Sequence, residues 1–280
     1  MTEASSSASN SPSWPIQHSY RQDLFRGTAE FYSQYRPAYP DAMFADLIRR
    51  AGDGGRLIDL ACGTGEIAIP LASRFAGVQA VDLEPDMVEV GRQKAAAAGV
   101  RNIEWSIGKA DLAVAAPVDL VTIGNAFHRL DRPLIAERAR GWLSPGGCSA
   151  VLGSSTPWSG SQPWQHVAVD VVAHWAGGPG SPASSSAAPV GGRARRTHED
   201  VLCDTGFVEV TEYQFPTQHT WTVDEFLGFL WSTSYTAPLR ENPSRAAEFE
   251  KDMRTKLSGF APSGQLRETI AHYYILARNP

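Results

Sequence analysis

The sequence predicts an α/β fold in which a parallel sheet is covered by helices on both faces. Short apolar strands alternate with helices from Arg56 to Leu152, which is the pattern of a buried parallel sheet. A glycine-rich loop, Asp59–Gly65, stands where the first of these strands meets its helix. The length of 280 residues is also a common size for one large α/β domain.

Two helices are expected before the alternating region. Apolar and aromatic residues between Leu24 and Tyr35 indicate a first helix, which Arg36-Pro37 terminates. The second is expected over Asp41–Ala51, capped by Asp41. The Ser-rich residues 1–17 are expected to form a disordered N-terminal arm, because they carry too little apolar surface to offset chain entropy.

The alternating region predicts five strands and three helices. The strands are expected at Arg56–Ala61, Val78–Asp82, Ile103–Ile107, Val118–Ile123 and Cys148–Leu152. The helices are expected at Gly65–Phe75, Pro85–Ala98 and Arg132–Trp142. A turn at Ser144–Gly147 leads into the last of these strands.

The rhythm changes after Gly153, where a helical lid is expected as an insertion over residues 154–196. Within it, residues 177–192 are Gly-, Ser- and Pro-rich and predict a flexible loop. The remaining elements are expected at Pro163–Ala176, His198–Thr205, Phe207–Gln214, Val223–Tyr235, Arg245–Leu257 and Thr269–Ala277. Residues 18–280 are therefore predicted to be a single domain.

Composition and charge exclude several classes of protein. The 25 basic residues against 30 acidic ones give a net charge of -5, whereas nucleic-acid-binding proteins usually carry a basic stripe. No apolar run is long enough to cross a bilayer, and the N-terminus lacks the pattern of a signal peptide. Cys62, Cys148 and Cys203 have no metal-ligand spacing. We expect a cytoplasmic protein with no metal, nucleic-acid or membrane partner; the oligomeric state stays open.

The glycine loop and an acid at the end of the second strand predict an adenosine-type ligand. Gly63 and Gly65 allow a tight turn and close approach of a ligand to the backbone. Asp82 follows Gly63 by 19 positions, close to the offset of an acid that binds ribose hydroxyls.

A dinucleotide is the first ligand to consider, because Gly63, Gly65 and Ala68 satisfy the permissive form of the dinucleotide motif. However, Glu66 at the expected helix start would repel a pyrophosphate, and Asp59 adds a second acid nearby. Acids here suit a ligand with an ammonium and a sulfonium group, which is S-adenosylmethionine. The alternatives are an NAD(P)-dependent oxidoreductase and a non-catalytic S-adenosylmethionine-binding protein.

Five motifs occur in order along the chain: DLACGTG, VDLEPDM, GKADL, VTIGNAFHRLD and LSPGG. In this order and spacing the chain resembles the class I S-adenosylmethionine-dependent methyltransferases. The flanking segments YRPAYP and LWSTSY resemble the small-molecule branch of trans-aconitate-type methyltransferases (methyltransferase types 11 and 25). The resemblance implies a Rossmann-like, seven-stranded, mostly parallel sheet with an antiparallel last strand. It also implies S-adenosyl-L-methionine as cofactor and S-adenosyl-L-homocysteine as product.

The resemblance assigns residues to the methionine end of the cofactor. Gly63 and Gly65 would let the backbone approach it, with Asp59 near the ammonium group. Arg36 would hold the carboxylate, because a guanidinium matches that group, although a surface ion pair is the alternative. Asn125 would line the pocket near the transferred methyl group.

The resemblance also assigns residues to the adenosine end. Asp82 would accept hydrogen bonds from the ribose hydroxyls, Met87 would pack on the adenine, and Asp111 would accept from the adenine amino group. Met87 as a core residue and Asp111 as a helix or turn cap are the alternatives.

His128 is the candidate catalytic residue. It follows the fourth strand, at the ligand-binding end of the sheet, and histidine titrates near neutrality. A general base helps when the methyl acceptor is a hydroxyl or an ammonium group. The alternative is a pocket-wall residue that only orients the substrate. The family often has an aromatic residue after this histidine, and Arg129 replaces it here.

Candidate substrate-binding residues follow the fifth strand. His166, Asp170 and His174 recur at i, i+4 spacing and therefore share one helix face. Trp231 and Tyr235 combine an aromatic body with a polar tip. We expect a small acceptor with an oxygen or nitrogen nucleophile, such as a polar secondary metabolite, a sugar or an amino sugar, as in antibiotic biosynthesis. The alternative is a helix that points these groups at water beside an aromatic pocket for a phenol.

Overall fold

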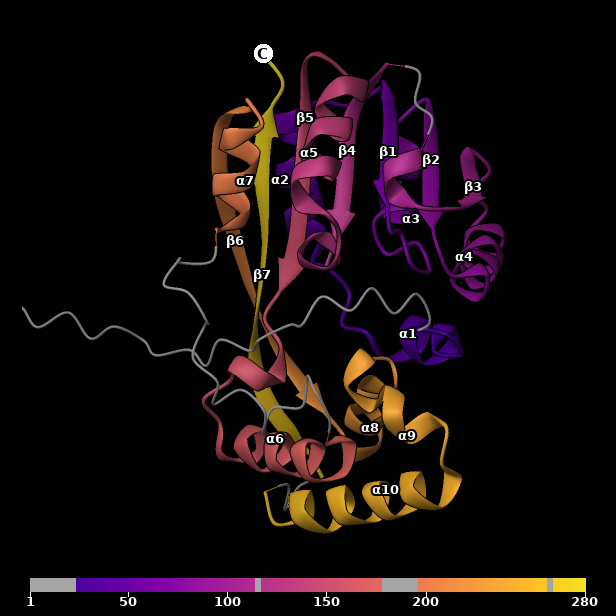
Figure 1. The fold of residues 1–280 in the computed structure, drawn as a ribbon, viewed down its shortest axis with the longest axis vertical. Coiled ribbons are helices and arrows are strands. Elements are labelled where there is room, and N and C mark those ends of the chain that lie inside the picture. Colours follow the sequence, from indigo (N-terminus) through magenta and orange to yellow (C-terminus); the bar gives the residue numbers. More distant parts are fainter. Residues whose placement is uncertain (1–23, 114–116, 178–195, 261–263) are drawn as a thin grey trace, which may run out of the picture.

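Seven strands form one sheet in the order β3-β2-β1-β4-β5-β7-β6 in the computed structural model, which describes residues 24–113, 117–177, 196–260 and 264–280 (Figure 1). The strands are β1 Arg56–Leu60, β2 Gly77–Asp82, β3 Ile103–Ile107, β4 Val118–Gly124, β5 Leu143–Ser154, β6 Val208–Trp221 and β7 Leu266–Arg278. The first five pair in parallel, whereas β7 is antiparallel to both β5 and β6. The expected mostly parallel sheet with an antiparallel last strand is confirmed.

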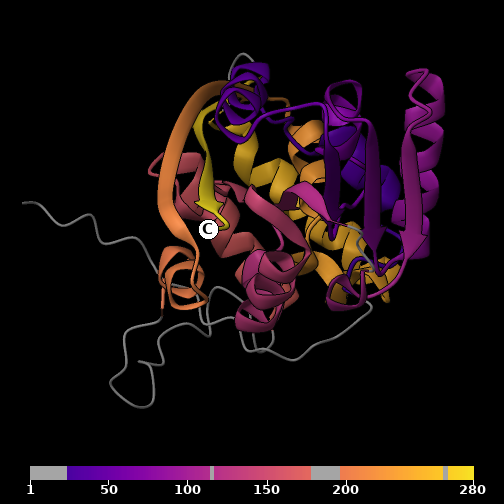
Figure 2. The same ribbon diagram turned by 90° about the horizontal axis from the view of Figure 1, so that it is seen from above.

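Helices cover both faces of this sheet. On one face lie α2 Asp41–Ala51, α3 Ala68–Leu71 and α4 Pro85–Ala97. On the other face α5 Arg132–Trp142 and α7 His198–Asp204 lie side by side (Figure 2). Short 3-10 helices stand between these elements. η1 Ala72–Arg74 follows α3, and η2 Ala110–Leu112, η3 Phe127–Arg129 and η4 Pro157–Ser159 follow β3, β4 and β5.

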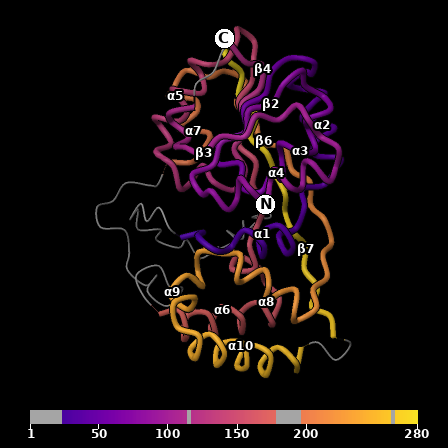
Figure 3. The backbone as a smooth tube through the Cα atoms, turned by 90° about the vertical axis from the view of Figure 1, so that its right-hand side faces the viewer, coloured from indigo at the N-terminus to yellow at the C-terminus, as the bar shows by residue number. Residues whose placement is uncertain are grey.

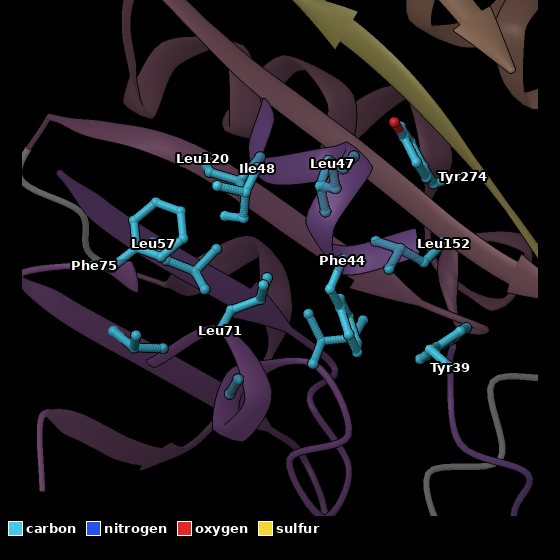
Figure 4. Close-up of a cluster of buried hydrophobic side chains, with 14 of the residues drawn as sticks. Tyr39, Phe44, Leu47, Ile48, Leu57, Leu71, Phe75, Leu120, Leu152 and Tyr274 are labelled. Atoms are coloured by element: carbon cyan, nitrogen blue, oxygen red, sulfur yellow. The ribbon is translucent and has the colours of Figure 1, made fainter. Parts of the chain in front are cut away.

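The core on the first face fixes the segment that leads into the sheet. Phe44, Leu47 and Ile48 of α2 pack with Leu57, Leu120 and other buried residues of the sheet (Figure 4). Each fully buried side chain of this size contributes about 1.5–3 kcal/mol to folding. Tyr39, just before α2, belongs to the same cluster, so the core also holds the segment that follows α1.

A helical cap stands at the carboxyl ends of the parallel strands. It consists of α6 Pro163–Ala176, α8 Val223–Trp231, η6 Ser234–Thr236, α9 Ala237–Arg240 and α10 Pro243–Ser258, gathered at the far ends of β6 and β7 (Figure 3). The cap is larger than the insertion expected over residues 154–196, because α8, α9 and α10 pack with α6 in one apolar cluster. The expected arm, 1–17, and residues 178–192 of the expected loop lie outside the described residues.

Strand β6 is longer than expected. The predicted strand ends at Gln214, whereas β6 continues through Pro216 to Trp221 and pairs with β7 along its length. Proline is tolerated in β6 because β6 is the edge strand of the sheet, where one row of N–H groups needs no partner. This extension carries the two strands from the sheet into the cap.

Three local expectations near the first strands are corrected. Asp41 does not cap α2, because Pro40 occupies the N-cap position and Asp41 is the first helical residue. The helix expected over Gly65–Phe75 shrinks to α3 followed by η1, since Gly65 has a φ of +88° and belongs to the loop. The turn expected at Ser144–Gly147 lies within β5, as an irregularity in its pairing with β4.

We expect Gly228→Ala to destabilise the contact between the cap and helix α1 (Ala29–Tyr35). A Cβ atom at Gly228 would lie 2.4 Å from Cδ2 of Tyr35, so α1 and α8 would have to separate. Overpacking of this kind costs about 1–3 kcal/mol in the free energy of unfolding. Urea denaturation measures this loss. Gly259→Ala is the control, because its new methyl group would meet nothing within 4 Å. Equal unfolding free energies for the two variants would contradict the prediction.

Candidate functional site

A cavity lies between the carboxyl ends of the strands and the helical cap. Its empty space, counted together with its open mouth, is about 1250 Å³. Its walls come from α1, from the loops after β1, β4 and β5, and from the cap. Strands β1 and β4 are neighbours here while the chain continues to opposite sides of the sheet, and such a switch point is the usual ligand site of open α/β sheets.

The glycine loop after β1 adopts a conformation that only glycine accepts easily. Gly63 and Gly65 have φ angles of +55° and +88°. A Cβ atom at Gly65 would also lie 2.8 Å from the ring of Trp105. The loop is tied to the second strand, because Gly63 N donates to Oδ2 of Asp82 at 2.8 Å. The structure thus brings the glycine loop and Asp82 together, as expected.

Asp82 is held by backbone donors on both carboxylate oxygens. Oδ1 accepts from Glu84 N at 2.9 Å, and Oδ2 accepts from Gly63 N. Burial raises the pKa of Asp82. Each carboxylate oxygen retains acceptor capacity for a hydroxyl group of a ligand. Asp82 does not line the enclosed cavity, so an adenosine group here would lie beyond its wall, along the ends of β2 and β3.

Apolar side chains are exposed at this edge of the sheet, and the sequence analysis missed them. Leu83 follows β2 and is 39% exposed, and Leu112 in η2 is 66% exposed. Their positions directly after Asp82 and Asp111 were the available signal. Asp111 is half-buried in η2, whereas Met87 is only 3% exposed within α4. A flat apolar ring would therefore meet Leu83 and Leu112 more readily than Met87.

Asp59 lies at the base of the cavity and is fully buried. Its Oδ1 accepts from Oγ1 of Thr122 at 2.8 Å, and its Oδ2 accepts from Ala68 N at 3.2 Å. Burial raises the pKa of Asp59 to about 7. A cation placed beside this carboxylate would restore its charge, which fits the ammonium group of the expected cofactor.

Arg36 forms the neighbouring wall and carries an unused donor. One terminal nitrogen donates to Ser232 O at 3.1 Å, and the guanidinium lies 4.8 Å from the ring centroid of Tyr32. Its Nε is buried without a hydrogen-bond partner among the residues that the structure describes. Buried donors normally have partners, so this one fits the carboxylate of the expected cofactor.

The place of Glu66 differs from the expectation. Helix α3 begins at Ala68 with Ile67 as N-cap, so Glu66 is not at the helix start. Its carboxylate lines the cavity and forms an ion pair with Lys94 at 2.8 Å. Lys94 offsets much of the charge of Glu66, so Asp59 would disfavour a pyrophosphate here more than Glu66 would.

We expect cofactor binding to weaken as the pH falls below 7. Asp59 is protonated below its pKa of about 7, and placing an ammonium group beside it requires that proton to leave. The dissociation constant of S-adenosylhomocysteine should therefore rise by up to about tenfold per pH unit below 7. Calorimetry across this range measures the dependence. Asp59→Asn should flatten it, whereas Asp170→Asn, on the solvent face of α6, should not.

The raised pKa of Asp59 also makes the stability of the fold depend on pH. An unfolded aspartate titrates near pH 4, so between pH ~4 and ~7 the folded state alone holds this proton. The free energy of unfolding of the cofactor-free protein should therefore fall as the pH rises through this range, and Asp59→Asn should reduce the slope. An unchanged slope in the variant would show that Asp59 does not titrate as described.

His128 and Asn125 stand on the wall after β4. His128 lies in η3, is half-buried and lines the cavity, as expected. Asn125 also lines it, with a φ of +50°. Its side chain accepts from Ser154 N at 3.0 Å and donates to the hydroxyl of Tyr39 at 2.9 Å. Asn125 therefore joins β4, β5 and the segment before α2, and shapes the wall beside His128.

Three of the expected substrate-binding residues lie outside the cavity. His166, Asp170 and His174 share one face of α6, but all three are exposed. The i, i+4 spacing defined a common face without its direction. The opposite face, with Trp164, Ala168 and Val172, is buried in the cap. The expectation that the three polar groups converge on the acceptor is wrong.

The structure places the two aromatic candidates, Trp231 and Tyr235, in different environments. Tyr235 lines the cavity and meets Trp158 edge to face at 4.9 Å between ring centroids. Trp231 lies in the cap core, packs on Phe249 and donates from Nε1 to Glu250 at 2.8 Å. Only Tyr235 is placed to touch a ligand.

Several cavity residues were missed by the sequence analysis. Arg129, Trp158 and Glu268 all line the cavity. Glu268 accepts from Trp221 Nε1 at 2.6 Å and from Gln165 Nε2 at 2.7 Å, which ties β7, β6 and α6 together. Arg129 had a signal, because it departs from the family's motif. Trp158 and Glu268 had none, since only folding places them here.

The described residues offer neither a metal site nor a membrane-spanning helix. Within those ranges, no three His, Cys, Asp or Glu side chains are grouped so as to hold a metal ion. No helix there has both the length and the apolar character needed to cross a membrane.

Comparison with known proteins finds a match to methyltransferases. Residues 57–147 match the model of the methyltransferase domain family. A ubiquinone/menaquinone biosynthesis C-methyltransferase of Geotalea daltonii is 29% identical over 116 residues, which cover 37% of this chain and 47% of that protein. The chain thus spans about half the length of this relative. Residues 57–147 are a methyltransferase domain.

Solved structures extend the likeness to the whole fold. A type II methyltransferase structure from Anaeromyxobacter dehalogenans shares 23% identity and a TM-score of 0.56, covering 87% of this chain and 98% of that one. The phosphoethanolamine N-methyltransferase 2 of Haemonchus contortus, in complex with S-adenosyl-L-methionine, shares 16% identity and a TM-score of 0.51, over 94% and 60% of the two chains. At these identities the likeness shows the fold, so this chain shares the fold of these methyltransferases around a segment, residues 57–147, that matches the methyltransferase domain.

Proposed function

We propose that this protein transfers the methyl group of S-adenosyl-L-methionine to a small molecule bound under the helical cap. The observation that carries the proposal is one cavity that joins two kinds of wall. Arg36 and Asp59, beside the glycine loop, form a wall that fits the methionine part of the cofactor. His128 stands on the wall that would face the acceptor.

The residues present fit the cofactor at three points. Asp59 offers a carboxylate for an ammonium group, and the unpartnered Nε of Arg36 offers a donor for a carboxylate. Asp82, outside the enclosed part, offers acceptors for ribose hydroxyls. When bound, the cofactor supplies a methyl carbon already activated by a sulfonium. The protein's own task is to align the acceptor and to exclude water, which the cap does.

The proposed acceptor atom is oxygen or nitrogen, with His128 as the base that removes its proton. A hydroxyl or an ammonium group attacks poorly while protonated, so a base on the cavity wall is useful for these acceptors. The relative from Geotalea daltonii is named a C-methyltransferase, but the match covers only 37% of this chain. The cap, which would choose the acceptor, is built largely from other residues.

The proposed acceptor is a small secondary metabolite, such as a precursor in antibiotic biosynthesis. The cavity is enclosed under the cap, and the chain carries a net charge of -5, neither of which suits a nucleic acid. An amino sugar loses its support, because Asp170 and the two histidines of α6 face solvent. The aromatic walls favour a flatter and less polar acceptor.

The proposal is tested by incubating the protein with S-adenosyl-L-methionine and a panel of small metabolites, with mass spectrometry of the products. Formation of S-adenosyl-L-homocysteine together with a methylated acceptor is the expected result. Tight binding of NAD(P) in place of S-adenosyl-L-methionine would indicate an oxidoreductase. Binding of S-adenosyl-L-methionine without turnover of any acceptor would favour a non-catalytic binding protein.

A further inference from the structure

Arg129 is a half-buried cation that has no acidic partner among the described residues. It follows His128 in η3, is half-buried and lines the cavity. Its Nη1 donates to the hydroxyl of Ser234 at 3.2 Å, and its guanidinium lies 4.5 Å from the ring centroid of Phe25. No Asp or Glu in the described ranges forms an ion pair with it. Buried guanidinium groups are normally paired, because removal from water is costly for a lone charge.

Arg129 and Arg36 are close enough to interact electrostatically, but they have different partners on the cavity wall. Arg129 contacts Ser234 in η6 of the cap and Phe25 before α1. Arg36 also reaches the cap, through Ser232 O and the ring of Phe229, but its guanidinium lies over Tyr32. The charges that neighbour Tyr32 include Asp59, Glu66 and Asp82 of the cofactor wall. The two arginines are thus available for two different anions. One of these anions is the carboxylate of the cofactor, which leaves Arg129 for the acceptor.

A second unused donor lies in the same wall. Trp158 is 4% exposed and lines the cavity, and its Nε1 has no hydrogen-bond acceptor among the described residues. Its ring meets Tyr235 edge to face. Burial raises the pKa of Tyr235, so its hydroxyl remains a donor at neutral pH. The buried indole N–H of Trp158 requires an acceptor atom that a ligand would supply, and the hydroxyl of Tyr235 can donate beside it.

The rest of this part of the cavity is aromatic. Phe25, Phe229 and Trp221 line it together with Trp158 and Tyr235. The acid in the lining beyond Asp59 and Glu66 is Glu268, and both of its oxygens are already bound by Trp221 and Gln165. Among the described residues of this part of the cavity, a cationic ligand would therefore meet no unoccupied carboxylate. An anionic ligand would meet the guanidinium of Arg129 and the indole N–H of Trp158.

We propose that the methyl acceptor carries a carboxylate on an aromatic body, and that Arg129 and Nε1 of Trp158 bind this carboxylate. The inference rests on the proposed function, and it names the substrate class for that same site. Arg129 would supply charge and a planar pair of donors, and Trp158 one further donor. The aromatic wall would hold the ring, and His128, adjacent in sequence, would face the atom that is methylated.

Binding of matched probes tests the proposal without requiring the true acceptor. The probes are 3-phenylpropanoate, 3-phenylpropanamide and 3-phenylpropylamine, which share one ring and chain and differ in the charge of the end group. Calorimetry on the wild-type protein saturated with S-adenosylhomocysteine should show the carboxylate binding at least about tenfold tighter than the amide. The amine should bind more weakly still.

Variants assign this preference to residues. Arg129→Met should abolish it, so that carboxylate and amide bind equally, while Arg26→Met, an exposed arginine next to Phe25, should retain it. Trp158→Phe keeps the ring and removes the N–H, and should weaken carboxylate binding by about threefold to tenfold. Arg129→Lys keeps the charge and should retain part of the preference, which guards against a folding defect in Arg129→Met.

The outcomes separate this inference from the proposed function. Binding of S-adenosylhomocysteine to the wild type, measured first, tests the cofactor site alone; if it fails, the probes are measured on the free protein by the same criterion. Equal binding of the three probes to the wild type would overturn the inference and leave the methyltransferase proposal standing. An intact preference in Arg129→Met, with a loss of S-adenosylhomocysteine affinity, would overturn it too and assign Arg129 to the cofactor carboxylate.

Discussion

Asp82→Ala should weaken the binding of S-adenosylhomocysteine by about 100-fold or more. The carboxylate offers two oxygens to the ribose hydroxyls, and a hydrogen bond to a charged group is worth about 1.5–3 kcal/mol. The substitution also removes the acceptors of Gly63 N and Glu84 N, so the glycine loop loses its tie to β2. Both effects weaken the binding of S-adenosylhomocysteine.

Calorimetry with S-adenosylhomocysteine measures this loss directly. Asp86→Ala is a matched control, because Asp86 lies four residues further on and is exposed in the first turn of α4. Thermal unfolding should show that Asp82→Ala remains folded. Binding of wild-type strength in that variant would remove Asp82 from the cofactor site, and with it the central argument for an adenosine ligand.

His128→Ala should lower kcat by about 100-fold to 10,000-fold at neutral pH, with a much smaller effect on acceptor binding. General base catalysis typically contributes this much, and the base acts only on the reacting proton. The loss should shrink as the pH rises, because the acceptor then loses its proton to solvent without help. Initial rates at saturating S-adenosyl-L-methionine across neutral and alkaline pH measure both features.

His166→Ala is the control for this substitution, because His166 is an exposed histidine outside the cavity. It should leave kcat and its pH dependence unchanged. If His128→Ala also stays within about twofold of the wild type, it contributes less than ~0.5 kcal/mol to the barrier. His128 would then orient the acceptor without moving its proton.

The α/β fold was predictable because its signals are local. The apolar strands ending at Leu60 and Asp82 and the glycines between them define a strand, a tight loop and a second strand without long-range information. Their spacing in the chain is short, so the ends of β1 and β2 had to be neighbours. The sequence could therefore place the two acids proposed for the cofactor, Asp59 and Asp82, beside the glycine loop.

The acceptor side was not predictable in the same way. Arg129 follows β4, Trp158 follows β5 and Glu268 lies in β7, and these segments meet because the three strands are neighbours in the sheet. The i, i+4 pattern of α6 marked a polar face correctly, but its direction depended on the burial of Trp164 and Val172 against α8 and α10. Periodicity defines faces, and only packing orients them.

The sequence by itself determined the sheet, the glycine loop and the positions of the acids around it, because glycine conformation, strand burial and acid spacing are properties of short segments. The tertiary structure decided which side chains line the cavity under the cap. It turned His166, Asp170 and His174 toward water and buried Arg129 without an acid partner in the described ranges. The physical reason is that the free energy of a charge depends on its burial and its partners, which a linear pattern does not contain.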